Sequence, residues 1–277
     1  MTLFGQCLYL LTLLIARKEF EIIYRNVELI FGLPSHSRFA QQFARQVLRH
    51  TIFTQLETLK LMLNPEQGYF RGIEKLRETF SRYPNQGFVV IAAHIGSWEL
   101  VGHVVATAQG KPLVALAKPP KQRFLQSLLQ NFRASMRTHI LWTDRASLLR
   151  DMLNVIKAKC CLVFVMDQRP KSGKGHSVSF MGRSTSFVQG PAAIAKRSGA
   201  KVIAIYCLRK EAWTYEVEHK VIDFEKDTSE AELTSFMAES VEEKVRLYPE
   251  QWTWNYRRWP QEQANPAEES LPLITIQ

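Results

Sequence analysis

A chain of 277 residues is long enough to bury one sizeable core, and its 46% hydrophobic content excludes a largely disordered protein. The net charge is +10, and residues 118–183 account for all of it, with 13 Lys or Arg against three acids. Such a region favours phosphates, an acidic carrier protein or an anionic membrane as partners, although a solvated charged face is the alternative. The chain has no helix-turn-helix, zinc-finger or RNP-like pattern, so nucleic acid is not an expected partner.

None of the four cysteines has the spacing of a metal site, and the adjacent pair Cys160-Cys161 lies within an apolar run. We interpret Cys7, Cys160, Cys161 and Cys207 as buried thiols in a reducing compartment. The sequence therefore predicts no metal site.

The N-terminus carries an apolar run from Leu3 to Ala16, which is interrupted by Gln6 and closed by Arg17-Lys18. A helix of this length covers about 21 Å, less than the roughly 30 Å hydrocarbon core of a bilayer. The run lacks a basic leader and a cleavage site, so a signal peptide is not expected. We predict a membrane-associating segment over residues 1–20 that dips into the bilayer, spans it with local thinning, or packs on the body. If it inserts, the basic pair favours a cytoplasmic body.

Residues 36–63 place apolar side chains at helical spacing and predict a further helix. Four Lys or Arg side chains give this helix a basic character. An interfacial helix among lipid headgroups and a core helix with one wet face fit the pattern equally well.

The body of the chain alternates apolar runs with helical stretches. The expected strands are 88–93, 113–117, 160–166 and 201–208, and the helices between them are 97–108, 121–137, 145–158 and 188–198. This alternation predicts a layered α/β domain over residues 21–260, with a largely parallel sheet flanked by helices. A strand at 213–218, antiparallel to 201–208, and a helix at 229–247 complete the domain. The polar tail over residues 261–277 is expected to be loose.

The segment His94-Ile-Gly-Ser-Trp-Glu99 follows the first buried strand and carries an imidazole and a carboxylate five positions apart. On an ideal helix these two groups would lie about 140° apart, so they meet only if Gly96 bends the chain between strand and helix. Glu99 would then fix the tautomer of His94, and His94 would take a proton from an attacking hydroxyl. A histidine that merely bonds a loop at a strand end is the alternative.

Two further polar groups end expected strands, Lys118 and Asp167. In a parallel sheet the carboxyl ends of strands collect functional groups, so both are candidates for the same site as His94. Gln168 and Arg169 follow in the next loop, where we expect phosphates or sugars of a substrate to bind. Asp167 either orients a basic or sugar group there or caps a turn.

An aromatic cluster lies near the end of the domain and contains Trp252, Trp254, Tyr256 and Trp259. Tyr and Trp suit a membrane interface, where one side is apolar and the other wet. A C-terminal plug that closes the core is the alternative, and it is the interpretation we favour.

Five blocks carry a family resemblance. In chain order they are Arg25-Asn-Val-Glu-Leu-Ile-Phe-Gly-Leu-Pro34, His94-Ile-Gly-Ser-Trp-Glu99, Phe164-Val-Met-Asp-Gln168, Phe180-Met-Gly182 with Gly190-Pro-Ala-Ala-Ile-Ala-Lys-Arg-Ser-Gly-Ala200, and Pro249-Glu-Gln-Trp-Thr-Trp-Asn-Tyr-Arg-Arg-Trp259. Together they resemble the H-x4-D/E glycerolipid acyltransferase superfamily. Within it they look most like the bacterial lipid A late acyltransferases and the mycobacterial phosphatidylinositol mannoside acyltransferases. One block departs, because Lys118-Pro119 stands where the family usually carries an Arg-Pro pair, and Lys lacks the bidentate fork of Arg.

The resemblance implies a membrane-associated O-acyltransferase at the cytoplasmic face of a bacterial inner membrane. It would move a fatty acyl chain from a thioester, on acyl carrier protein or coenzyme A, to a hydroxyl of a lipid A precursor. His94 would be the general base and Glu99 its orienting group, with Gly96, Lys118, Asp167, Gln168 and Arg169 at the substrate. No bound metal or cofactor is implied, since the thioester supplies its own activation.

Three alternatives stay open. The same residues would serve a lysophospholipid or mannolipid acceptor with an acyl-CoA donor. A His-dependent lipid hydrolase or thioesterase would use water in place of the hydroxyl, although the chain lacks the G-x-S-x-G motif of a serine hydrolase. A catalytically silent membrane-binding relative is the third.

Overall fold

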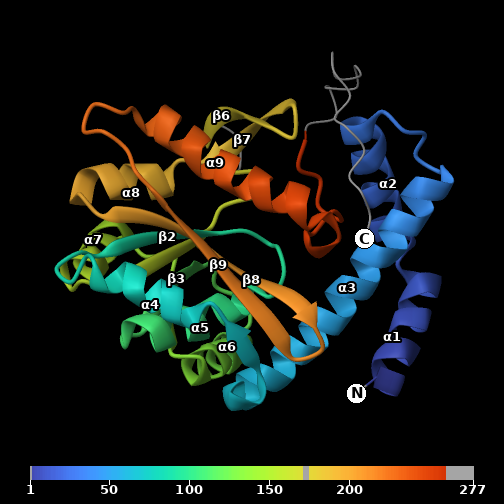
Figure 1. The fold of residues 1–277 in the computed structure, drawn as a ribbon, viewed down its shortest axis with the longest axis horizontal. Coiled ribbons are helices and arrows are strands. Elements are labelled where there is room, and N and C mark those ends of the chain that lie inside the picture. The colour runs from blue at the N-terminus through green and yellow to red at the C-terminus, as the bar shows by residue number, and fades with distance from the viewer. Residues whose placement is uncertain (1, 171–174, 260–277) are drawn as a thin grey trace.

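The computed structural model describes residues 2–170 and 175–259, and it contains a seven-stranded sheet with helices on both faces (Figure 1). The strands of the sheet are β1 (Tyr69–Arg71), β2 (Phe88–Ala92), β3 (Leu113–Ala117), β4 (Thr138–Trp142), β5 (Cys161–Val165), β8 (Lys201–Glu211) and β9 (Thr214–Ile222). The α-helices are α1 (Thr2–Ile15), α2 (Arg17–Phe31), α3 (Arg38–Leu63), α4 (Ile73–Ser81), α5 (Val101–Gln109), α6 (Arg123–Ser135), α7 (Leu148–Lys157), α8 (Gly190–Ser198) and α9 (Glu230–Leu247). A separate hairpin pairs β6 (Gly175–Phe180) with β7 (Arg183–Val188). Short 3-10 turns are η1 (Pro65–Gln67), η2 (Trp98–Leu100) and η3 (Pro249–Gln251).

The strand order is β1-β9-β8-β2-β5-β3-β4, and the five strands from β8 to β4 run parallel. The predicted α/β class with a largely parallel sheet is therefore confirmed. The strand predicted at 213–218 overlaps the first part of β9, which begins at Thr214, runs on to Ile222 and pairs antiparallel with β8 as expected. The predicted tail from residue 261 lies outside the described residues.

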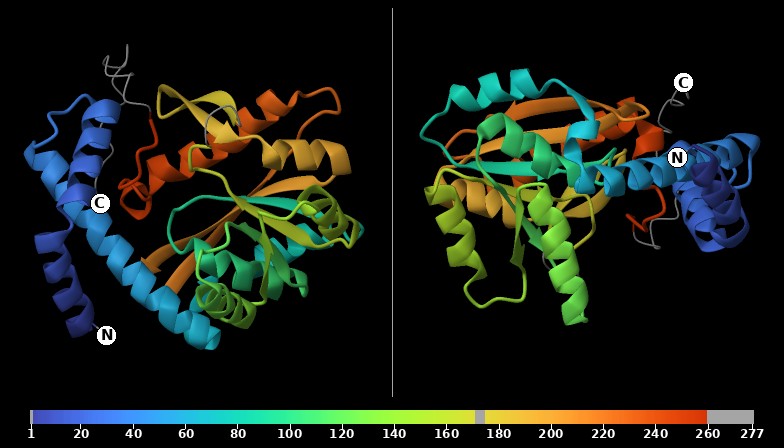
Figure 2. Two further views of the ribbon diagram at one scale, coloured as in Figure 1. Left: turned by 180° about the vertical axis from the view of Figure 1, so that it is seen from behind. Right: turned by 90° about the horizontal axis from the view of Figure 1, so that it is seen from below.

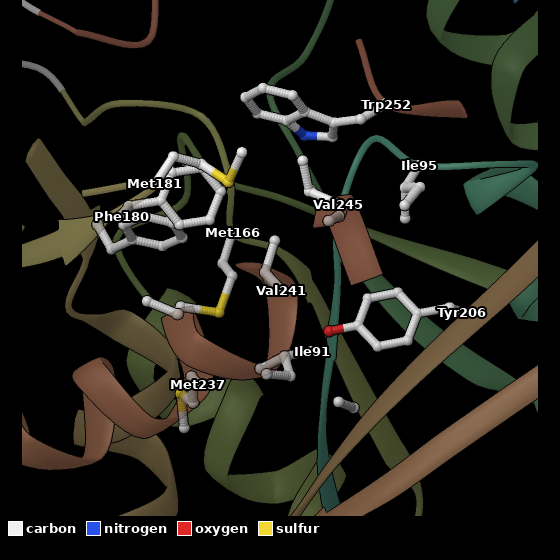
Figure 3. Close-up of a cluster of buried hydrophobic side chains, with 14 of the residues drawn as sticks. Ile91, Ile95, Met166, Phe180, Met181, Tyr206, Met237, Val241, Val245 and Trp252 are labelled. Carbon is white, nitrogen blue, oxygen red and sulfur yellow. The ribbon is translucent and has the colours of Figure 1, made fainter. Parts of the chain in front are cut away.

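Alternate residues of β2 face two different cores, one on each side of the sheet. Val89 and Ile91 pack with α8 and α9 on one side, whereas Phe88 and Val90 pack with α4 and α5 on the other. Every residue of β2 is buried, which is the pattern of a central strand covered on both faces. The first of these cores is drawn in Figure 3, where Met166, Phe180 and Tyr206 lie with side chains of α9 and with Trp252.

The N-terminal helices α1, α2 and α3 pack together at one end of the molecule (Figures 1 and 2). α3 corresponds to the helix predicted at 36–63, and it buries Phe43, Val47 and Leu61 among other side chains. It is thus a core helix with one wet face. The apolar run predicted at the N-terminus forms α1, whose large side chains are mostly exposed. No helix within residues 2–170 and 175–259 is both long and apolar enough to cross a bilayer.

Several elements were not predicted, namely α2, α4, β1, β4 and the β6–β7 hairpin. β4 is an edge strand of the sheet, and its apolar run covers only residues 140–142, because Thr138 and the exposed His139 precede it. The prediction of buried thiols is confirmed for Cys161 and Cys207, but it is wrong for Cys7, which is exposed, and for Cys160, which is only half-buried.

Glu57 is a buried residue of α3, only 1% exposed, and its side chain links this helix to the sheet. Its carboxylate accepts hydrogen bonds from both Nε and Nη2 of Arg209, at 2.8 and 2.7 Å, and from the hydroxyl of Tyr215 at 2.9 Å. Arg209 also exchanges two backbone hydrogen bonds with the Gln251 side chain, at 3.0 and 2.8 Å. The network therefore ties α3, the end of β8 and the C-terminal segment into one unit.

Candidate active site

His94 and Asp167 are brought together by the register of two neighbouring strands. β2 pairs with β5 so that Ala92 lies opposite Val165, and the residues two positions further along both chains therefore emerge at the same edge. The Nδ1 atom of His94 lies 2.7 Å from Oδ1 of Asp167. The backbone N–H of His94 donates to Oδ2 of the same carboxylate at 2.9 Å. Asp167 is 3% exposed, so the carboxylate is shielded from water, whereas the His94 ring is partly exposed.

A third donor to Asp167 comes from the C-terminal segment. The indole N–H of Trp252 donates to Oδ2 at 2.8 Å. Burial alone would raise the pKa of Asp167, but the charge of His94 and these hydrogen bonds outweigh it and hold the pKa below its usual value. Asp167 is therefore an ionised carboxylate whose position is set from three directions.

The protonation of His94 follows from its partner. Burial lowers the pKa of His94, but the Asp167 charge, the hydrogen bond to Asp167 and the Glu99 charge raise it, and the net shift is upward. Because Nδ1 faces a carboxylate, this nitrogen carries the proton of the neutral ring, and Nε2 is left as the basic atom. The Gln168 amide nitrogen lies 3.3 Å from Nε2, and the ring centroids of His94 and Trp98 are 5.0 Å apart.

The predicted orienting role of Glu99 is not what the structure shows. Glu99 forms a bidentate ion pair with Arg133 of α6, at 3.0 and 2.6 Å, while Asp167 takes the hydrogen bond to the His94 ring. The reason is geometric: the chain after Gly96 enters the short turn η2, and this turn presents Glu99 to α6. The contribution of Glu99 to His94 is that of a nearby charge.

The predicted bend at Gly96 is confirmed. Its φ is +57°, a left-handed conformation that favours glycine, and a Cβ atom there would collide with the carbonyl of Cys207. The N–H groups of Gly96 and Ser97 donate to the carbonyls of Gln251 and Cys207, at 3.0 and 2.8 Å. The segment after His94 is thus hydrogen-bonded through its backbone to both β8 and the C-terminal segment.

Lys118, Gln168 and Arg169 lie at the same edge of the sheet, as their positions after β3 and β5 predict. All three side chains are exposed. Neither the Lys118 ammonium nor the Arg169 guanidinium makes a hydrogen bond or an ion pair with any other residue of the described ranges. Two exposed cations therefore lie in the loops that follow β3 and β5, at the edge of the sheet that also carries His94 and Asp167.

The aromatic cluster near the C-terminus is buried and closes the core, which is the interpretation that we favoured from the sequence. Trp252, Trp254 and Trp259 are each at most 2% exposed. The plug also touches the site directly, because Ile95 and Trp252 form a β-bridge and the N–H of Thr253 donates to the carbonyl of His94 at 3.0 Å. Figure 3 shows Trp252 above the cluster that contains Phe180.

Three contacts of this site were missed from the sequence. Asp167 was identified as a candidate, but its pairing with His94 was not. Arg133 and Trp252 were not assigned to the site at all. Trp252 could have been found from its place in the closing block, whereas Arg133 lies in a helix with no motif.

Comparison with known proteins identifies the family of this chain. The family model described as bacterial lipid A biosynthesis acyltransferase matches residues 6–261. The lipid A biosynthesis palmitoleoyltransferase of Escherichia coli (strain K12) is 24% identical over 253 residues, covering 88% of this chain and 79% of the relative. A lipid A biosynthesis acyltransferase of Shigella flexneri matches equally well. A phosphatidylinositol mannoside acyltransferase of Mycolicibacterium smegmatis is 24% identical over 183 residues, covering 63% of this chain and 57% of the relative. Because the family match extends over nearly the whole chain, this protein belongs to the bacterial lipid A biosynthesis acyltransferases and is an O-acyltransferase that acts on a lipid acceptor.

Proposed function

We propose that this protein transfers a fatty acyl chain from an acyl carrier protein thioester to a hydroxyl of a lipid A precursor, with His94 as general base. The observation that carries the proposal is the 2.7 Å contact between His94 Nδ1 and Asp167, which leaves Nε2 as a basic atom at the open edge of the sheet. A base oriented by a buried carboxylate is the arrangement that proton abstraction from a hydroxyl requires.

The reaction proceeds in two steps. Nε2 of His94 takes the proton of the acceptor hydroxyl as its oxygen attacks the thioester carbonyl, and Asp167 stabilises the imidazolium that forms. The tetrahedral intermediate then collapses, the C–S bond breaks, and the departing thiolate takes the proton from Nε2. The products are an ester on the lipid and a free carrier thiol. Lys118 and Arg169 bind acceptor phosphates or stabilise the oxyanion.

Direct transfer is favoured over an acyl-enzyme. The serine nearest in sequence to His94 is Ser97, which is buried, and its hydroxyl is hydrogen-bonded to that of Thr58. Cys207 is also buried, and burial raises the pKa of its thiol far above the usual range. Neither side chain has the exposure or the activating base that a nucleophile needs.

The relatives support the choice of acceptor. The E. coli and Shigella proteins are named as lipid A biosynthesis enzymes, and the mycobacterial name keeps a mannolipid acceptor as the second candidate. The basic region 118–183 suits an acidic carrier protein. α1 exposes Leu3, Phe4, Leu10, Leu11, Leu14 and Ile15, which supports association with a membrane. The basic pair Arg17-Lys18 that follows favours the cytoplasmic face of the inner membrane as part of this proposal.

Lipid mass spectrometry on cells that lack this protein tests the proposal. We expect a lipid A species lighter by one acyl chain, restored by the wild-type protein and not by His94→Ala. Loss of an acyl chain from a mannolipid or phospholipid instead would replace the acceptor. Free fatty acid as the main product of the purified protein with acyl thioester and acceptor would indicate a hydrolase.

The pH dependence of the rate tests the pairing with Asp167. A general base must be neutral, so kcat/KM rises as the pH passes the pKa of His94, which Asp167 raises. Asp167→Asn keeps the shape but removes the charge. We therefore expect the rising limb to move to lower pH, while the plateau falls by about 10²-fold or more. An unshifted limb would show that Asp167 does not set the protonation of His94.

A further inference from the structure

α6 is a helix whose apolar side has little to pack against. None of its residues is buried, although Leu125, Leu129 and Phe132 are half-covered by the body. Phe124 and Leu128, one turn apart on the same side, are 69% and 46% exposed. In the right-hand view of Figure 2, α6 extends away from the sheet.

The charge around α6 has one sign. Between Glu99 and Asp144 the sequence contains no acidic residue, but it contains six Lys or Arg. Three of these, Lys118, Lys121 and Arg123, lie in the loop that leads into α6 and at its first position, and all three are exposed. Exposed apolar side chains beside exposed cations are the features of a helix that lies at an anionic bilayer surface.

The helix is also connected to the catalytic edge. Arg133, near its C-terminus, holds Glu99 in the bidentate ion pair described above, five residues from His94. At its other end, the loop that precedes α6 begins at Lys118, one of the cations beside the site. A surface that engages α6 would therefore lie close to the substrates of the proposed reaction.

We propose that α6 and its leading loop form a second membrane-docking element, separate from α1, that binds an anionic lipid bilayer through Phe124 and Leu128 and through Lys121 and Arg123. The inference rests on the proposed function, since a lipid acceptor lies in the bilayer. An acidic carrier protein is the rival occupant. An acidic carrier would pair with Lys121 and Arg123, but it would offer Phe124 and Leu128 no hydrocarbon phase to enter.

A site-specific probe tests the insertion. In a Cys7→Ser/Cys160→Ser background, Leu128→Cys is labelled with an environment-sensitive fluorophore and mixed with phosphatidylethanolamine–phosphatidylglycerol vesicles. We expect a blue shift and quenching by lipids that carry a nitroxide on the acyl chain. Phe236→Cys on α9 is the matched control, because Phe236 is 41% exposed on the opposite side of the sheet, and its label should show neither change. A label at 128 that stays in water would overturn the proposal.

Vesicle partitioning separates the two kinds of contact. Lys121→Gln/Arg123→Gln should weaken partitioning onto anionic vesicles by about 30-fold at low salt, which corresponds to about 1 kcal/mol for each charge. Phe124→Ser/Leu128→Ser should weaken it roughly 100-fold, while Phe236→Ser should leave it unchanged. All side chains involved are exposed, so unchanged circular dichroism is expected of each variant. Weakened carrier binding with unchanged partitioning would assign the surface to the carrier. These measurements need no turnover, so they stand even if the proposed reaction fails.

Discussion

His94→Ala is expected to lower ester formation by about 10³-fold, within the 10²–10⁴-fold range of general-base catalysis, while the protein stays folded. The ring is partly exposed at the edge of the sheet and is not part of either hydrophobic core. Its loss should therefore lower the reaction rate much more than the stability of the fold. The measurement is the rate of acylated lipid formation from purified protein, thioester donor and acceptor, followed by mass spectrometry. The free fatty acid should be measured in the same samples.

His139→Ala is the matched control, since this histidine is exposed on the edge strand β4 and has no role in the site. It should retain wild-type activity. Retention of more than a tenth of the activity by His94→Ala would contradict the proposed base. Loss of ester formation with retained hydrolysis would show that His94 serves the acceptor hydroxyl and is not needed for water.

Glu57→Ala is expected to be the most destabilising of the substitutions considered, by about 3–5 kcal/mol in the free energy of unfolding. The substitution leaves the Arg209 charge, which is largely covered, without its carboxylate, and it removes the acceptor of the Tyr215 hydroxyl. Because Arg209 also bonds Gln251, we expect the C-terminal plug to loosen and activity to fall with stability.

Guanidinium chloride unfolding followed by circular dichroism measures this effect. Glu74→Ala is the matched control, because Glu74 pairs with Arg77 on the exposed face of α4 and such pairs contribute about 0–1 kcal/mol. A Glu57→Ala protein as stable as the Glu74→Ala protein would show that the network does not fasten α3 to the sheet.

The sequence near His94 did not reveal which carboxylate bonds its ring, Glu99 or Asp167. The five-residue spacing in the H-x4-E block suggested that the two groups of one segment meet, and the bend at Gly96 was correctly placed. Yet the carboxylate that bonds the imidazole comes from a position 73 residues further along the chain. Which residue fills a role therefore depended on which strands are neighbours.

The sequence by itself determined the α/β class, the strand that precedes His94 and the bend at Gly96, and it favoured the buried C-terminal plug over a membrane interface. Hydrophobic periodicity and glycine stereochemistry are local properties, so a single chain reveals them. Only the tertiary structure decided that Asp167 holds His94, that Trp252 holds Asp167 and that Arg133 holds Glu99. These partners depend on strand order and register, which arise because burial on both faces of the sheet selects one packing among many. The short edge strand β4 and the exposed side of α6 were likewise decided by what surrounds them.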